Sequence, residues 1–216
     1  MNGPGERLIR AACTDETITV YQAYPPQIAD AAVRAGTFVP PFSRDRMTWI
    51  KPSFGWMMQR CGWARKPGQE HVLAISLRRS GFEWALAHSC LSHFQAGMHA
   101  NQGEWEAMKA ASPVRVQWDP DRCLTGERLS RRAIQIGLSG PAVRVYIGEW
   151  ITRLQDITAL VRQIEGLVRD GRIAEAARQL PAERVYPLSP AIAARIGAGP
   201  SPEPVASGVR ENGASR

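Results

Sequence analysis

Residues 71–77 have the sequence HVLAISL, a nearly continuous apolar run with a turn-like Lys-Pro-Gly at 66–68 before it and two arginines at 78–79 after it. A short apolar run between turn signals predicts a strand that is buried on both faces. Such a strand has to lie inside a sheet, and we expect the first 140 residues to hold most of that sheet.

Short strand-like and helix-like runs follow one another in irregular order along the chain. β-branched and aromatic residues predict further strands, and apolar residues at helical spacing predict helices. The strands are expected at 17–24, 47–51, 114–118 and 133–138, and the helices at 26–35, 54–60, 82–94, 142–150 and between Asp156 and Gly171. Asp119-Pro120-Asp121 predicts a turn. This order favours an α+β protein, a single domain with a central mixed or antiparallel sheet and helices concentrated in the C-terminal third.

The ends of the chain differ in composition from its middle. Residues 1–7 are expected to be a flexible N-terminus, 8–196 the single domain, and 197–216, which are mostly Gly, Pro, Ser, Ala and Glu, a disordered tail. No stretch has the roughly 18–20 continuous apolar residues that cross a bilayer, and the first residues lack the apolar core of a secretory signal. We therefore expect a cytoplasmic protein with no membrane partner; the sequence indicates no oligomeric state.

The cysteines and histidines do not form a recognisable metal site. The four cysteines contain no C-x-x-C pair, so we expect reduced, mostly buried thiols. His88, Cys90 and His93 lie close together, but no second ligand cluster accompanies them, and we predict no metal. The sequence also lacks G-x-G-x-x-G, a Walker-type loop, G-x-S-x-G and H-E-x-x-H, which removes support from four large enzyme classes.

Residues 41–66 combine positive charge with aromatic rings. The segment carries six basic side chains against one acidic one, and Trp49, Trp56 and Trp63 fall within a span of 15 residues. Cations bind phosphate and indole faces stack on bases or on a nicotinamide ring, so the mixture favours a nucleotide or nucleic-acid site. The alternative is that Trp49 and Trp56 belong to the core, with arginine stems packed over them. The net charge of +7 also favours polyanionic or phosphate-bearing partners.

Ser53 follows Pro52 at the junction between the strand expected at 47–51 and the helix expected at 54–60. Its hydroxyl either caps the helix or faces a ligand, and the sequence leaves both readings open. The free backbone N–H groups at the helix start offer a place for an anion in either case.

The runs IRAACTDETITVYQAY, PPFSRDRMTWIKPSFGWMMQRCGWARK, GFEWAL, RVQWDP and IQIGLSG resemble an uncharacterised family known as domain of unknown function 4291. The resemblance covers about residues 8–196. The family's name implies no activity, so the resemblance indicates membership and leaves the function to be argued from the residues.

The run TVYQAY, the helix that ends at Gly36 and the run TWIKPSFGWMM are similar in order to elements of ADP-ribosyltransferases and RNA 2′-phosphotransferases. That resemblance implies NAD as the cofactor and puts Gln22 and Ser53 at matching positions. Gln22 replaces the usual His or Arg, and the later strand RAIQIGL offers Gln135 and no glutamate. Glutamine can orient an acceptor but cannot steady a developing oxocarbenium charge. Either another acid such as Glu70 or Glu83 serves, or the site binds a nucleotide without standard transfer chemistry.

Three functional hypotheses follow. The first is an enzyme that binds NAD or another nucleotide and performs ADP-ribosyltransferase-like group transfer with an atypical active site, with Gln22, Ser53 and Gln135 as catalytic candidates converging in one concave site. Its cofactor-binding candidates are Tyr21, Tyr24, Arg46, Trp49, Lys51, Trp56 and Arg60. The second is a non-catalytic nucleic-acid (RNA) binding module with a basic and aromatic surface. The third is an interaction or structural protein whose tryptophans are core.

Overall fold

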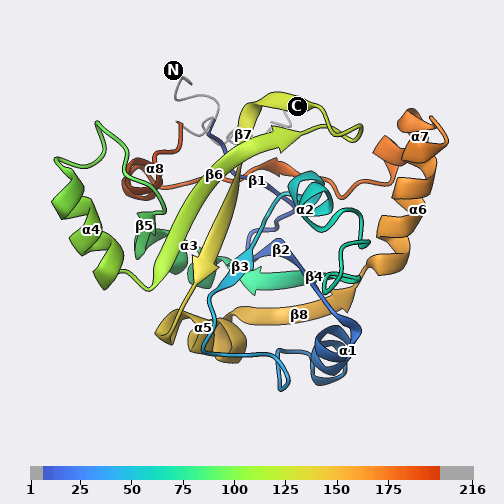
Figure 1. The fold of residues 1–216 in the computed structure, drawn as a ribbon, viewed down its shortest axis with the longest axis horizontal. Helices are drawn as coiled ribbons and strands as arrows, with labels where there is room; N and C mark the ends of the chain where they lie inside the picture. The colour runs from blue at the N-terminus through green and yellow to red at the C-terminus, as the bar shows by residue number, and fades with distance from the viewer. Residues whose placement is uncertain (1–6, 200–216) are drawn as a thin grey trace, which may run out of the picture.

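Two sheets hold most of the strands in the computed structural model, which describes residues 7–199 (Figure 1). The first sheet is antiparallel with the order β2-β4-β8, where β2 spans Thr17–Tyr24, β4 spans His71–Arg78 and β8 spans Ile151–Asp156. The second has the order β3-β7-β6-β5, with β3 at Thr48–Ile50, β7 at Arg128–Leu138, β6 at Val114–Arg122 and β5 at Ser89–Leu91. Its β5–β6 pair is parallel and its other pairs are antiparallel. A short pair of β1 (Arg10–Ala11) and β9 (Arg184–Val185) joins the two ends of the described chain.

Helices alternate with these strands along the chain, and the predicted α+β class is confirmed. The helices are α1 (Pro26–Ala35), α2 (Phe54–Cys61), α3 (Arg79–Ala87), α4 (Gln102–Ala111), α5 (Pro141–Val145), which continues as a π-helical turn (Tyr146–Trp150), α6 (Thr158–Arg169), α7 (Ile173–Arg178) and α8 (Pro190–Ile196). Local signals set several of their ends. Gly36, for example, ends α1 with a positive φ of 70°, a conformation that favours glycine.

The strand β4 is buried on both faces, as its apolar run predicts. Successive side chains of a strand point to opposite faces. Leu73 and Ile75 pack in one core cluster with residues of α1, whereas Val72 packs in a second cluster with Met57 of α2 and Val161 of α6. The first sheet therefore lies between two layers of helices.

In the described part of the chain, one isolated β-bridge connects the two sheets. Tyr21 of β2 donates its backbone N–H to the carbonyl of Lys51 at 2.7 Å, and Lys51 donates back to the carbonyl of Tyr21 at 3.3 Å. Lys51 directly follows β3, so the bridge joins the edge strand β3 of one sheet to the edge strand β2 of the other.

The helix expected at 82–94 is shorter than predicted. α3 ends at Ala87, and Ser89–Leu91 form β5 instead. These three residues are buried and pair in parallel with β6. Pairing with a distant strand has overridden the local helical spacing, as tertiary context often does.

The turn predicted at Asp119-Pro120-Asp121 is wrong, because β6 continues through these residues to Arg122. The chain reverses later, near Gly126, which has a φ of 89°. A register shift between Pro120 and Arg122 accommodates the proline, which has no N–H to donate to the ladder.

The termini remain largely outside the described residues. The predicted flexible N-terminus and disordered tail lie there, apart from Arg7 and residues 197–199, where Gly199 donates its N–H to the carbonyl of Arg7 at 2.9 Å. Within residues 7–199, no helix combines the length and the apolar character that crossing a membrane requires.

Candidate functional site

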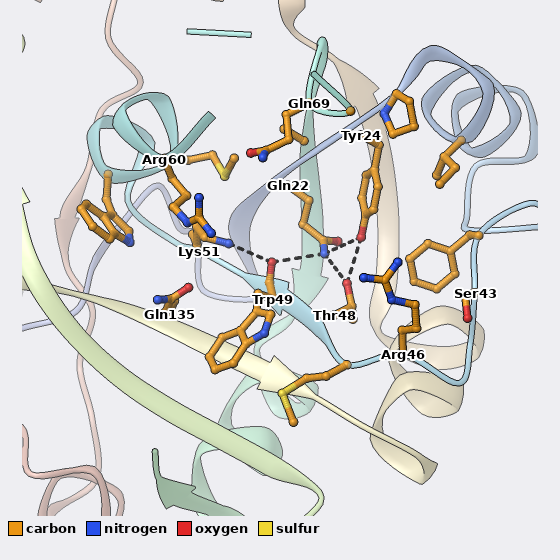
Figure 2. A pocket seen from close by; sticks show the side chains of 18 of the residues that line it. Gln22, Tyr24, Ser43, Arg46, Thr48, Trp49, Lys51, Arg60, Gln69 and Gln135 are labelled. Atoms are coloured by element: carbon orange, nitrogen blue, oxygen red, sulfur yellow. Dashed lines mark hydrogen bonds between the residues drawn. The ribbon is translucent and has the colours of Figure 1, made fainter. Parts of the chain in front are cut away.

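A cavity of about 850 Å³ opens where β2, β3 and α2 meet the face of β6 and β7 (Figure 2). We call it the main cavity. Its lining comes from residues 22–25 and 28, the segment 41–43, 46–49 and 51, residues 56, 57 and 60 of α2, residues 68–69, and the polar side chains Gln117, Asp119 and Gln135. Its volume lies in the range of about 300–1,000 Å³ that is usual for small-molecule sites.

Three cationic side chains reach the main cavity. Lys51 is only 6% exposed, and its ammonium donates to the carbonyl oxygen of Trp49 at 3.2 Å. Burial lowers the pKa of Lys51 to about 8; the Arg60 cation lowers it too, whereas the Asp119 carboxylate raises it. Arg46 and Arg60 are exposed, and within residues 7–199 neither guanidinium has a hydrogen-bond or ion-pair partner. The cavity therefore carries positive charge that the described chain does not neutralise.

Gln22 is held by hydrogen bonds within the protein. Its Nε2 donates to Thr48 Oγ1 at 2.6 Å and to Tyr24 Oη at 2.9 Å (Figure 2). Its Oε1 accepts from Tyr146 Oη at 2.7 Å. Its side chain is 3% exposed. The amide is thus held by the hydroxyl groups of three neighbouring residues, and the catalytic role of Gln22 stays a prediction.

A carboxylate faces the same space. Asp119 accepts from Gln135 Nε2 at 2.6 Å on one oxygen and from Gln117 Nε2 at 2.8 Å on the other. Among the described residues that line the main cavity it is the only acid. Two amide donors fix its orientation. Its negative charge attracts the Lys51 ammonium and raises the pKa of Lys51.

Aromatic side chains complete the walls. Trp49 on β3 and Trp56 on α2 are part-buried and line the main cavity, with Tyr24 and Phe42. The Nε1 of Trp56 is buried and has no hydrogen-bond partner in the described protein. Gly137 of β7 makes room for Trp49, because a Cβ there would lie 3.0 Å from the indole carbon Cε2. An unpaired buried donor carries a cost that an acceptor on a ligand would remove.

Eight of the ten predicted site residues line the main cavity. They are Gln22, Tyr24, Arg46, Trp49, Lys51, Trp56, Arg60 and Gln135. The expected convergence of Gln22, Ser53 and Gln135 in one concave site is therefore met by Gln22 and Gln135 and not by Ser53.

Ser53 and Tyr21 lie outside the cavity lining. Ser53 Oγ accepts from the N–H of Trp56 at 3.4 Å, so its hydroxyl caps α2. The N–H of Phe54 donates to Glu183 at 2.6 Å, and this carboxylate occupies the place where an anion could meet the helix start. Tyr21 is 1% exposed and packs edge-to-face on Phe54 with 5.5 Å between ring centroids. Both residues serve the packing of α2.

The other candidates of the basic segment also have structural partners. Trp63 packs against the cluster formed by α2 and α6, and Arg65 pairs with Glu165 at 2.6 Å. Of the two substitute acids, Glu83 accepts from Tyr186 at 2.7 Å and Glu70 from the N–H of Gly68 at 2.8 Å. Neither acid lines the main cavity.

Sequence reasoning missed Asp119 and Gln117 as site residues. Both lie on β6, and in a strand residues 117 and 119 share a face. Gln135 is the register partner of Gln117 on β7, so it points to that face as well. The alternation of apolar and polar residues from Val114 to Trp118 predicts that the next residue, Asp119, shares a face with Gln117. Pro120 indicated a turn instead, and Asp119 was therefore not assigned to the strand.

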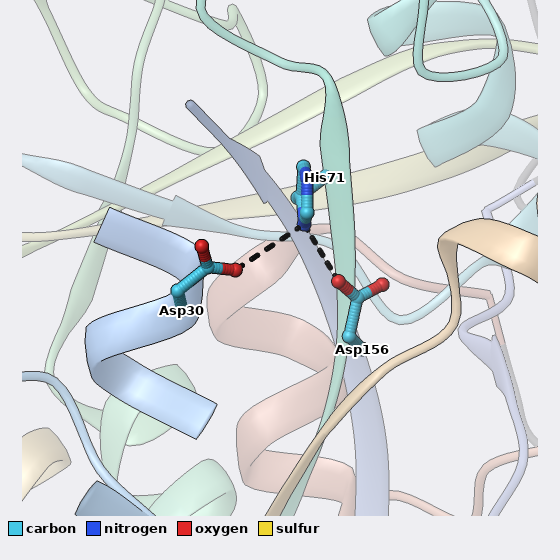
Figure 3. Close-up of side chains that lie close together, drawn as sticks. All are labelled: Asp30, His71 and Asp156. Atoms are coloured by element: carbon cyan, nitrogen blue, oxygen red, sulfur yellow. Dashed lines mark hydrogen bonds and ion pairs between the residues drawn. The ribbon is translucent and has the colours of Figure 1, made fainter. Parts of the chain in front are cut away.

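One cluster of potential metal ligands lies near α1 (Figure 3). His71 Nδ1 is 2.7 Å from Asp156 Oδ2 and 3.8 Å from Asp30 Oδ1. Burial raises the pKa of Asp156, but the hydrogen bonds from Thr158 and His71 outweigh it, and the pKa lies below its ordinary value. The hydrogen bond between His71 and Asp156 accounts for the close approach of these two side chains.

Comparison with known protein families gives one result. The family model described as "Domain of unknown function (DUF4291)" matches residues 8–186. No curated protein matches the chain.

Proposed function

The chain belongs to this family, whose description assigns no activity, and we propose from the main cavity that the protein is a nucleotide-binding transferase that takes NAD as its substrate. The buried ammonium of Lys51 carries the proposal. Burying an ammonium costs several kcal/mol unless an anion pairs with it. Here it has one carbonyl acceptor, and the oxygens of Asp119, the carboxylate that raises its pKa, are each held by a glutamine amide. A phosphate group would supply the missing anion.

The rest of the main cavity fits such a ligand. Arg46 and Arg60 offer planar donors that suit phosphate oxygens. Trp49 and Trp56 offer ring faces for a base or a nicotinamide. A mixture of ring faces and cations is typical of nucleotide sites.

Asp119 supplies the negative charge that a transfer from NAD requires. In the proposed step the acceptor oxygen forms a bond to the anomeric carbon of the nicotinamide ribose while the bond from that carbon to the pyridinium nitrogen breaks. The bonding pair leaves with nicotinamide, which departs neutral, and the proton of the acceptor passes to Asp119 and then to water. The carboxylate stabilises the positive charge that develops on the ribose. This role replaces the one expected of Glu70 or Glu83.

The test is a thermal-shift titration of the purified protein with NAD and ADP. A ligand that binds the folded state raises its stability by RT ln(1 + [L]/Kd). We expect both nucleotides to raise the melting temperature of the wild type and neither to do so in Lys51→Met. Lys109→Met is the matched control, because Lys109 lies over Trp105 on α4 and outside the main cavity. The proposal fails if neither nucleotide shifts the wild type, or if Lys51→Met retains the full shift.

A nucleic-acid binding module is the second candidate. Arg46 and Arg60 are exposed at the cavity mouth and unpaired within the described chain, an arrangement that also suits a phosphate backbone. Salt dependence separates the two. When a protein binds along a single strand, the logarithm of the binding constant falls linearly with the logarithm of the salt concentration. The slope is about −0.7 for each phosphate contact. A slope of several units for an oligonucleotide, with no response to NAD or ADP, would favour the module.

A further inference from the structure

A second cavity of about 340 Å³ lies beside the outer edge of β6. β5 pairs with β6 only at residues 114–116, so in residues 7–199 no strand covers that edge beyond Val116 (Figure 1). Residues 91–95 pass next to it and form the other wall. The second cavity is separate from the main cavity, and the proposed function does not use it.

The two cavities meet at one side chain. Gln117 lines both of them. Its Nε2 donates to Asp119 at 2.8 Å, so the second cavity ends one side chain away from the carboxylate of the main cavity. A ligand in the second cavity would therefore approach the group to which the transfer chemistry is assigned.

The second cavity has the chemistry of an anion site with an aromatic face. Its described lining contains no carboxylate. Arg7 is fixed by a hydrogen bond to Gln95 Oε1 at 2.8 Å, and burial and then the neighbouring Arg132 cation lower the pKa of Arg7. His93 is exposed, and Phe94 leaves 38% of its surface open to solvent. Arg7 is thus the guanidinium that the described lining of the second cavity offers to an anionic ligand.

We propose that the second cavity binds a nucleotide unit of a single-stranded nucleic acid, with its phosphate on Arg7 and its base on Phe94, and thereby presents the acceptor for the transfer. The acceptor role rests on the proposed function, but the binding does not. The cavity volume lies at the lower end of the range for ligand sites and suits one ring with one phosphate. Neighbouring units of the strand would leave the cavity along the uncovered edge of β6.

The binding is measured by fluorescence anisotropy with a labelled tetranucleotide while ADP is present to occupy the main cavity. Phe94→Ala is expected to weaken binding at least about fivefold, the lower end of what one stacked base contributes. Arg7→Gln is expected to reduce the salt slope by about 0.7, the value for one lost phosphate contact on a single strand. Competition with AMP distinguishes a free nucleotide from a strand, because only a strand gains from contacts beyond the cavity.

Matched controls separate this surface from general effects. Trp84→Ala removes another exposed aromatic ring, 37% open to solvent and outside both cavities, and Arg34→Gln removes an exposed cation near the end of α1. Neither is expected to change the anisotropy. Lys51→Met should lose the thermal shift with ADP and still bind the tetranucleotide. A failure of the proposed function is therefore distinguishable from a failure of this inference. The inference is overturned if the wild type does not bind the tetranucleotide, if AMP competes as strongly as the unlabelled strand, or if Phe94→Ala and Arg7→Gln bind it unchanged.

Discussion

The ammonium nitrogen of Lys51 lies 3.2 Å from the carbonyl oxygen of Trp49, which is its one hydrogen-bond acceptor within residues 7–199. The same carbonyl accepts from Gln22 at 3.3 Å. A cation with three donors and 6% exposure is therefore held by one shared oxygen. Burial of the Lys51 ammonium lowers the free energy of unfolding. Such a loss of stability is expected of a residue that serves binding and not of one that stabilises the fold.

Lys51→Met is predicted to stabilise the protein while removing nucleotide binding. A folded-state pKa of about 8 against an ordinary value of 10.5 means that the charged form is disfavoured by folding at pH 7. Removing the charge should raise the free energy of unfolding by about 1–3 kcal/mol at that pH. The gain should shrink as the pH rises from about 8 to 10.5, because the folded wild type then carries a neutral amine. Urea denaturation at pH 7 and pH 10 measures both values, and a loss of stability at pH 7 would contradict the assignment.

Nucleotide binding is predicted to take up a proton above pH 8. A phosphate beside Lys51 favours the ammonium and raises the pKa of Lys51 from its value of about 8 in the free protein. Affinity should fall by up to about tenfold per pH unit between pH 8.5 and 10, because only the charged form pairs with phosphate. Calorimetric titrations in two buffers of different ionisation enthalpy give the number of protons taken up. Equal enthalpies in both buffers at pH 9 would exclude this coupling.

Asp119→Asn is predicted to separate binding from transfer. The variant keeps a polar side chain next to Gln117 and Gln135 but loses the negative charge. We expect nicotinamide release from NAD to slow at least about a hundredfold, in line with the loss of one electrostatic contact to a transition state. The dissociation constant for NAD should change less than about fivefold. Chromatographic measurement of nicotinamide checks the first and thermal shift the second. Unchanged release by Asp119→Asn would remove this residue from the chemistry.

Local signals were sufficient for part of the fold and of the site. The strand β2, the helix α1 with Gly36 at its end, and the apolar strand β4 follow from neighbouring residues, and all three are confirmed. The charged and aromatic side chains around β3 could be grouped from sequence for the same reason, because they lie within one short segment.

Other features depend on residues far apart in the chain. The amide oxygen of Gln22 accepts a hydrogen bond from Tyr146, 124 positions away, and that contact has no local signal. The helix start at Phe54 is capped by Glu183, 129 positions away. Asp119 was assigned to a turn because the sequence Asp-Pro-Asp at 119–121 is typical of turns. Pairing with β7 keeps β6 extended through these residues. Pairing and capping partners of this kind are set by the tertiary fold.

Gln22→Ala is predicted to destabilise the protein by about 2–4 kcal/mol. The substitution leaves a small void and deprives the buried hydroxyl of Tyr146 of its acceptor. Gln135→Ala is the matched control, since Gln135 is part-buried and its Nε2 makes one hydrogen bond, to Asp119. It should cost less than about 1 kcal/mol. Denaturation curves for the two variants decide the role of Gln22, and equal losses would argue against a special positioning function.

Glu183→Gln is predicted to flatten the dependence of stability on pH between 5 and 8. Burial raises the pKa of Glu183 to about 7, the N–H of Phe54 opposes that shift, and the nearby Asp121 carboxylate adds to it. Because the folded-state pKa exceeds the ordinary value of 4.5, the folded protein binds more protons than the unfolded chain between these two values. Stability is therefore lost as the pH rises toward 7, by about 2–3 kcal/mol from this group. Glu106→Gln, which replaces an exposed acid on α4, should leave the wild-type profile unchanged. Urea midpoints at pH 5 and pH 8 measure the difference, and a wild type and a Glu183→Gln variant with parallel profiles would show that this carboxyl does not titrate on folding.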